Sequence, residues 1–172
     1  MNSDKKIIAL MIALGAVARV APHPWNFTPM IALGLYAGAK ASKLYTGALI
    51  TLLALVLSDA VLGFSRDAFF VYPAFLIPVL LGRWVRRSEG VGTIAAGALF
   101  SSLSFFLITN AGVWAMGTLY PHTMAGLTTC LAAGVPFYRN QLLGDAMYTV
   151  ALFGGHYLLS RLARPSLAPA HQ

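Results

Sequence analysis

Apolar residues dominate the chain, and short polar segments divide them into six runs. We expect each run to form a helix, over residues 6–20, 28–41, 44–63, 68–84, 91–115 and 140–162. A membrane-spanning helix needs about 20 mainly apolar residues, so the second run is short for a crossing and is either tilted into a thin region or enclosed by its neighbours. The pattern therefore predicts an all-α membrane protein with six transmembrane helices.

Prolines and a shorter apolar piece modify this pattern. Residues 124–135 are too few to cross a membrane, so we expect a short interfacial or re-entrant helix between the fifth and sixth spans. Pro73 and Pro78 should kink or unwind the fourth span, because proline removes a backbone donor. We expect a single transmembrane domain over residues 1–165 and a disordered tail over 166–172.

Composition supports a membrane protein. The chain is 58% hydrophobic and only 10% charged, and its mean hydropathy is +0.73, which excludes an ordinary soluble domain. A net charge of +7 would suggest nucleic-acid binding in a soluble protein. Here the basic residues fall in short connections between apolar runs, which is typical of membrane topology. We therefore expect the lipid bilayer as a partner and no nucleic acid.

The distribution of lysine and arginine predicts the orientation. With six spans, nine basic residues fall on the side of the termini: Lys5, Lys6, Lys40, Lys43, Arg83, Arg86, Arg87, Arg161 and Arg164. Three fall on the opposite side: Arg19, Arg66 and Arg139. Because cytoplasmic loops carry the excess of lysine and arginine, both termini should be cytoplasmic.

The segment from Arg19 to Pro29 combines charge, imidazole, amide and proline between two apolar runs. Prolines at positions 22, 24 and 29 remove backbone donors and disfavour helix before each ring, so the segment should be a stiff, non-helical corner. Irregular backbone at membrane depth is tolerated only where it is buried in protein or lines a cavity. We interpret the corner as the rim or floor of a binding site.

The six-span topology places the unusual polar and aromatic residues in the outer half of the molecule. The candidate substrate-binding residues are Arg19, His23, Trp25, Asn26, Asp59, Asn110, Trp114, Tyr120, His122, Asn140, Asp145 and Tyr148. Asp59 and Asp145 lie within apolar runs, where an ionisable group is costly unless it is paired or hydrated. Arg19 is the most plausible partner of Asp59.

Each candidate also has a purely structural interpretation. The outer arginines could extend to the interface, and Trp25, Trp114 and Tyr120 could form an aromatic belt. His23 and His122 have no partner at metal-ligand spacing, and the single cysteine, Cys130, excludes a cysteine-only zinc site and fits a buried small hydrophobe. We therefore expect no metal site and no cofactor. The gathering of polar groups on one side weighs more than any single residue.

Several motifs carry a resemblance to a known family. They are Arg19-x-x-Pro-His-Pro-x-Asn-Phe-Thr-Pro29, Ser58-Asp59 with Gly63, Phe106-Leu-Ile-Thr-Asn110 with Trp114, Leu119-Tyr-Pro121, and Pro136-Phe-x-x-Asn140 with Gly144-Asp145. Across nearly the whole chain, the sequence resembles an uncharacterised family of small bacterial membrane proteins described as transport proteins. That family in turn resembles the S components of energy-coupling-factor (ECF) transporters, which bind vitamins such as riboflavin, thiamine, biotin or cobalamin from outside.

The resemblance implies six helices, cytoplasmic termini in the bacterial cytoplasmic (inner) membrane, and an outward-facing pocket closed by loops. It also implies that Ala9 and Ala13, an alanine pair four residues apart on the first helix, contact a coupling subunit. Cobalamin is one conceivable cargo, with His23, His122 or Cys130 as a cobalt ligand. The chain has no G-x-x-x-x-G-K-[ST] motif, so energy would come from partner ATPases or transport would be downhill.

The leading hypothesis is a membrane-embedded protein that binds and takes up a small water-soluble nutrient, and the resemblance to S components implies a vitamin. An integral membrane enzyme is the first alternative, but the chain has no G-x-S-x-G or H-E-x-x-H motif, so we expect no enzymatic activity. The second alternative is a non-catalytic assembly protein that docks another membrane subunit through Ala9 and Ala13.

Overall fold

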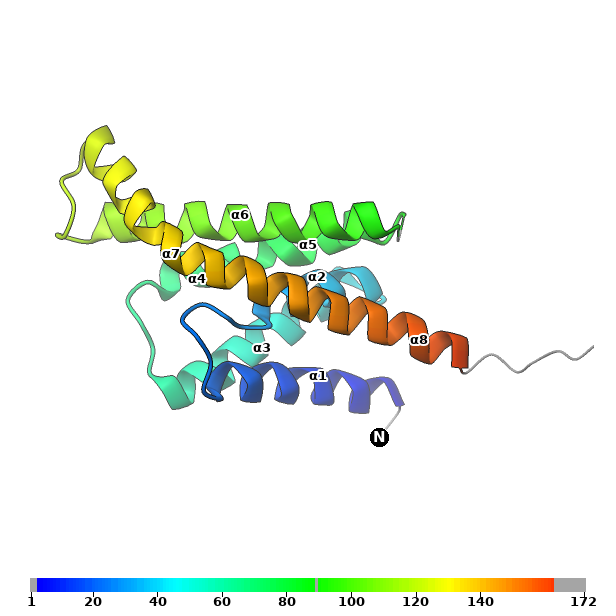
Figure 1. The fold of residues 1–172 in the computed structure, drawn as a ribbon. Helices are drawn as coiled ribbons and strands as arrows, with labels where there is room; N and C mark the ends of the chain where they lie inside the picture. The colour runs from blue at the N-terminus through cyan, green and yellow to red at the C-terminus, as the bar shows by residue number, and fades with distance from the viewer. Residues whose placement is uncertain (1–2, 89, 163–172) are drawn as a thin grey trace, which may run out of the picture.

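The structure, a computed structural model, describes residues 3–88 and 90–162. The described part contains helices and no strands, which confirms the expected all-α class. The helices are α1 (Ser3–Val20), α2 (Met30–Lys40), α3 (Leu44–Leu62), α4 (Ala68–Ala74), α5 (Leu76–Val85), α6 (Val91–Met116), α7 (Met124–Thr149), the π-helix η1 (Val150–Gly154) and α8 (Gly155–Leu162) (Figure 1). The expected disordered tail, residues 166–172, lies outside the described residues.

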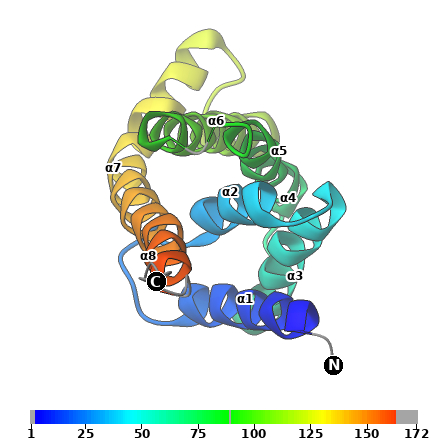
Figure 2. The same cartoon turned by 90° about the vertical axis from the view of Figure 1, so that its right-hand side faces the viewer.

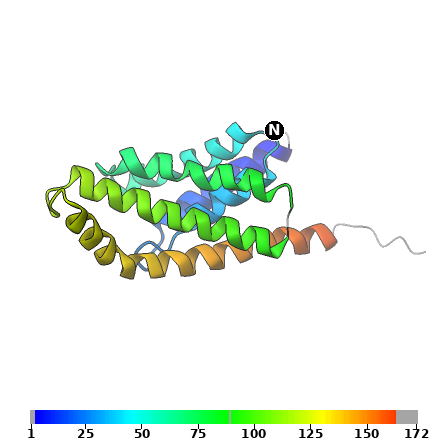
Figure 3. The same ribbon diagram turned by 90° about the horizontal axis from the view of Figure 1, so that it is seen from above.

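These helices form six segments, because α4 and α5 follow one another and α7, η1 and α8 are continuous. Each of the six apolar runs corresponds to one segment. By length and composition, α3, the α4–α5 pair and α6 could each cross a membrane. The start of α1 and the end of α8 lie at the same end of the bundle (Figures 1 and 3).

The prolines interrupt the fourth segment as expected. Phe75 separates α4 from α5, with Pro73 inside the first and Pro78 in the first turn of the second. Pro78 has no N–H, so it cannot donate to the carbonyl of Ala74 four residues earlier. The Phe75 amide still donates to the Val71 carbonyl at 3.1 Å. The chain therefore changes from one helix to the next without leaving a helical path.

The expectation of a separate short helix over residues 124–135 is wrong. These residues form the beginning of α7, which continues through Pro136 to Thr149. Proline costs a helix interior about 3 kcal/mol and usually kinks it, and Figure 1 shows the yellow beginning of α7 at an angle to its orange remainder. α7 packs closely on α6 just before this proline, because a Cβ atom added at Gly134 would lie 2.6 Å from Asn110 Oδ1.

The short second helix is enclosed by the others, one of the two expected explanations of its length. Figure 2 shows α2 inside a ring formed by the remaining helices, and nine of its eleven residues are buried. It approaches α5 through two glycines. A Cβ atom on Gly38 would lie 2.1 Å from the Val79 carbonyl oxygen, and one on Gly82 would lie 2.3 Å from that of Leu35. Small residues here allow the two backbones to touch.

Many large apolar side chains are exposed on the outward faces of the helices. Leu14 on α1, Val61 on α3, Leu99 on α6 and Val150 in η1 are each at least 59% exposed. Monomeric soluble proteins rarely expose such extensive apolar surface. The distribution resembles that of helices surrounded by lipid.

Candidate functional site

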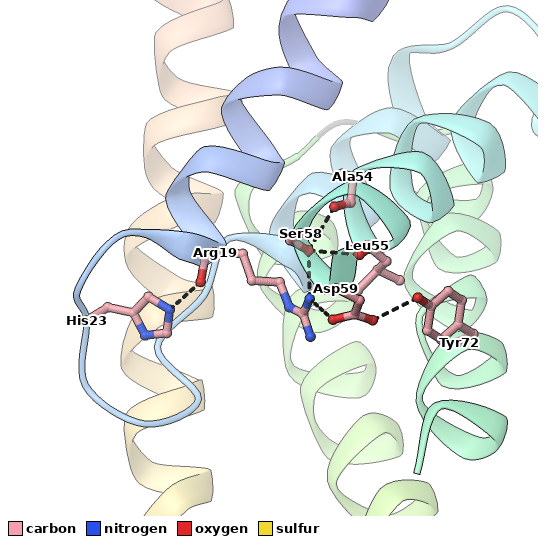
Figure 4. Close-up of polar contacts among 7 residues, drawn as sticks. All are labelled: Arg19, His23, Ala54, Leu55, Ser58, Asp59 and Tyr72. Carbon is pink, nitrogen blue, oxygen red and sulfur yellow. Dashed lines mark hydrogen bonds and ion pairs between the residues drawn. The ribbon is translucent and has the colours of Figure 1, made fainter. Parts of the chain in front are cut away.

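Arg19, at the end of α1, joins three helices through one polar network (Figure 4). Its Nη1 atom donates to Ser58 Oγ at 2.6 Å and forms an ion pair with Asp59 Oδ1. The Tyr72 hydroxyl, from α4, donates to the other carboxylate oxygen of Asp59 at 2.7 Å. The expected pairing of Arg19 with Asp59 is confirmed.

This network satisfies the buried carboxylate. Asp59 is 6% exposed, and each of its oxygens has a donor. Ser58 completes the arrangement, because its hydroxyl donates to the Ala54 carbonyl at 2.9 Å while accepting from Arg19. A buried ion pair is tolerated when further hydrogen bonds meet both partners. The network therefore fixes α1, α3 and α4 relative to one another.

The segment between α1 and α2 is non-helical, as the prolines predict. The two ring nitrogens of His23 lie 2.9 Å from the Arg19 carbonyl oxygen and 2.8 Å from that of Pro24. Asn26 has φ 61°, a left-handed conformation that asparagine adopts more readily than most residues. His23 thus fastens the corner to the end of α1.

A pocket of about 230 Å³ lies between this corner, α4, α6 and α7. Three of the expected site residues line it: Trp25, Asn26 and Asn110. The other lining residues are Asp67, Val71, Phe106, Thr109, Val113, Gly134, Phe137 and Gln141. The pocket thus combines amide groups with an aromatic wall, a composition suited to a small polar molecule with an apolar or ring portion.

Two amide side chains of the pocket are held by α6. Asn110 Nδ2 donates to the Phe106 carbonyl at 2.8 Å. Gln141 Nε2, from α7, donates to the Ser102 carbonyl at 2.9 Å and to Ser102 Oγ at 2.8 Å. Gln141 uses both amide hydrogens in these bonds, so its carbonyl oxygen is the group that it could offer a ligand. Asn110 uses one amide hydrogen, so it could offer a ligand its second N–H as well as its carbonyl oxygen.

Three other expected residues lie near the end of α6: Trp114 is in its last turn, and Tyr120 and His122 are in the connection to α7. Trp114 Nε1 donates to the Pro121 carbonyl at 2.9 Å, and His122 Nε2 lies 3.1 Å from the Gly117 carbonyl oxygen. The Trp114 and His122 rings pack edge to face at 5.7 Å. Tyr120 lies in the same connection. None of the three lines the pocket.

The remaining expected residues lie on α7 and do not line the pocket either. The Tyr148 ring packs against Phe27 at 5.8 Å, which ties α7 to the corner. Asn140 is partly exposed, beside the buried Gln141. Asp145 is only 3% exposed, and its carboxyl group lies beside Ser102 and Gln141. Its Oδ2 atom has no hydrogen-bond partner.

Sequence reasoning missed five polar or aromatic lining residues: Asp67, Phe106, Thr109, Phe137 and Gln141. Gln141 had a usable signal. It stands four residues before Asp145 and eight before Thr149, so all three share one face of α7. That spacing favours Gln141 over its neighbour Asn140 as the residue that points into the bundle.

No group of three or more His, Cys, Asp or Glu residues that could hold a metal ion occurs within residues 3–88 and 90–162. The three conceivable cobalt ligands each approach a backbone carbonyl instead. His23 and His122 do so as described above, and Cys130 Sγ lies 3.4 Å from the Asn110 carbonyl oxygen. Cys130 is 2% exposed, which confirms it as a buried small residue.

Comparison with protein families places the chain in one of them. The model of a family of unknown function, DUF6580, matches residues 1–167, so the chain belongs to that family. No curated protein and no solved structure matches the chain. Any function must therefore be argued from the pocket and its surroundings.

Proposed function

We propose that the protein is a six-span protein of the bacterial cytoplasmic membrane, with both termini cytoplasmic, that binds a small water-soluble nutrient for uptake. The apolar outer faces and the three helices long enough to cross a membrane support the membrane location. The excess of lysine and arginine on the side of the termini supports the orientation. In this orientation the pocket opens outward.

The observation that carries the proposal is the pocket formed by the proline corner, α4, α6 and α7. Its volume of about 230 Å³ is below the roughly 300–1,000 Å³ of pockets that hold drug-sized ligands. This size favours a small nutrient, such as a single-ring vitamin, over cobalamin, which is a large macrocycle. Asn26, Asn110 and Gln141 would orient the nutrient, and Phe106 and Phe137 would contact its ring.

Trp25 is placed to cover the entrance. It is 77% exposed and still lines the pocket, because it stands on the corner between α1 and α2. The corner is anchored at one end by His23 and at the other by Phe27, which packs on Tyr148. A small movement between these anchors would bring the Trp25 indole over a bound molecule, as lid loops do in other binding proteins.

Energy would come from a partner, in the manner of an ECF S component. Ala9 and Ala13 are exposed on α1, whereas Gly15 faces Leu33 and Ala54 in the interior. The alanine pair therefore leaves a smooth strip on the outside of the bundle that a helix of a coupling subunit could approach closely. ATPases bound to that subunit would supply the energy.

The proposal is tested with the purified full-length protein and a panel of vitamins and other small nutrients. We expect at least one compound to raise the melting temperature and to be retained in native mass spectrometry. Asn110→Ala should weaken binding at least tenfold, because it removes a polar contact inside the pocket. Asn140→Ala, outside the pocket, is the matched control. Absence of any ligand from a broad panel, or equal binding by both variants, would contradict the proposal.

A further inference from the structure

Asp145 is the most deeply buried acidic side chain of the described residues, and the pocket does not account for it. It lies on α7 where that helix packs on α6, and it is 3% exposed. Its Oδ2 atom has no hydrogen-bond partner. The groups beside its carboxyl are the neutral side chains of Ser102 and Gln141. A carboxylate in such surroundings is unstable unless a positive charge joins it.

The neighbouring elements do not supply that charge from their own side chains. α6 contains no ionisable residue at all. On α7, the carboxyl of Asp145 interacts electrostatically with the phenol of Tyr138, which carries no positive charge. α2 contributes Tyr36 and Lys40, and the Tyr36 hydroxyl lies 3.0 Å from His156 Nδ1 at the cytoplasmic end. No cation is among the groups that act on the Asp145 carboxyl.

Thr149 provides a second unsatisfied oxygen on the same face of α7. It is 6% exposed, and its Oγ1 atom also has no hydrogen-bond partner. Residues four apart on a helix are neighbours, with Cβ atoms roughly 5–6 Å apart. Three other buried hydroxyls bond to a carbonyl of their own helix: Thr51 to Gly47 at 3.1 Å, Ser58 to Ala54 at 2.9 Å and Ser101 to Gly97 at 2.7 Å. The Thr149 hydroxyl makes no such bond, and it stands one helical turn after Asp145.

The helix changes its winding immediately beyond Thr149. Residues Val150–Gly154 form the π-helix η1, a rare element that often marks functional sites. Around Gly154 and Gly155 an added Cβ would meet no atom within 4 Å. Neither glycine is therefore required by close packing, and the change of winding stands directly after Thr149.

We propose that Asp145 binds a monovalent cation, a proton or a sodium ion, at the interface of α6 and α7, with Thr149 as a second oxygen ligand. Carboxylate and hydroxyl oxygens suit a hard cation, and a proton neutralises the carboxylate equally well. Gln141 lines the pocket and also adjoins Asp145, so it connects the cation site to the pocket. Occupancy of the cation site could thereby change the pocket. The inference does not require the nutrient proposal to be correct.

The test uses the full chain in lipid nanodiscs, without any nutrient, with all four aspartates carrying a ¹³C label at the side-chain carboxyl. Infrared difference spectra then distinguish protonated from ionised aspartate. At neutral pH in sodium-free buffer, we expect one protonated aspartate. Its signal should be absent in Asp145→Asn and unchanged in Asp67→Asn, whose carboxyl is exposed.

Two further arms identify the cation. If it is sodium, adding sodium but not choline at constant pH removes the protonated signal, and Thr149→Val raises the sodium concentration needed by about tenfold. If it is a proton, the signal changes with pH and is indifferent to sodium. Either result supports the proposal.

The proposal is overturned if the labelled wild-type protein shows only ionised aspartates in sodium-free buffer at neutral pH. It is also overturned if a protonated aspartate persists in Asp145→Asn. Because the first measurement needs no variant, the test remains decisive even if Asp145→Asn fails to fold.

Discussion

Asp59 and Asp145 are two aspartates of similar burial, 6% and 3% exposed, in opposite electrostatic circumstances. Asp59 receives the guanidinium of Arg19 on one oxygen and the hydroxyl of Tyr72 on the other. Asp145 lies beside neutral side chains, and one of its oxygens has no partner. The first carboxylate joins three helices, and the second is confined to the contact between two.

This difference teaches that burial of a charge does not by itself identify a functional site. An ionisable residue within a membrane is a site hypothesis by default. Both carboxylate oxygens of Asp59, however, accept hydrogen bonds from Arg19 and Tyr72, so its role is structural. One carboxylate oxygen of Asp145 has no hydrogen-bond partner. The distinction depends on the partners, so substitutions at the two networks should have different consequences.

The largest effect is expected for Arg19→Ala. It would leave Asp59 buried without its countercharge, and breaking a buried pair in this way typically costs about 3–5 kcal/mol. The free energy of unfolding, measured by denaturant titration in one detergent, should fall by this amount. Arg139→Ala, which removes an exposed arginine, serves as the control. Equal stability of the two variants would show that the Arg19 network is not structural.

A smaller effect is expected for Tyr72→Phe. The change keeps the ring and removes only the hydroxyl that donates to Asp59 at 2.7 Å. A hydrogen bond to a charged group is typically worth about 1.5–3 kcal/mol. The same titration should show a loss in this range. In an Asp59→Asn background the loss should shrink, because the acceptor is no longer charged, and an undiminished loss would mean that the hydroxyl acts elsewhere.

The smallest effect is expected for Asp145→Asn, in contrast to Asp59→Asn. An amide resembles a protonated carboxyl in shape and has no net charge, so the free energy of unfolding at neutral pH should change by less than about 1 kcal/mol. Asp59→Asn should be clearly destabilising, because it leaves the Arg19 guanidinium without a countercharge. Comparable losses of unfolding free energy in the two variants would show that Asp145, like Asp59, has a charged structural partner, and the contrast between the two aspartates would be wrong.

Much of the architecture could be predicted from local patterns. The apolar runs gave six helical segments, the prolines around Phe75 gave the break between α4 and α5, and those between Arg19 and Pro29 gave the non-helical corner. The Arg19–Asp59 pair was also predictable, because the six-span order brings the two residues to the same end of the bundle. These features depend on neighbouring residues or on simple connectivity.

Three other features were decided only by tertiary structure. α7 remains continuous through Pro136, where it packs closely on α6 around Gly134. The spacing of Gln141, Asp145 and Thr149 shows that they share one face of α7, but only the rotation of α7 against α6 brings Gln141 to the pocket. Asp145 lies apart from the pocket and without a charged partner. The sequence determines which segments are helical and where charge is scarce, whereas the rotation and contacts of packed helices determine which polar atoms meet, because those contacts join residues far apart in the chain.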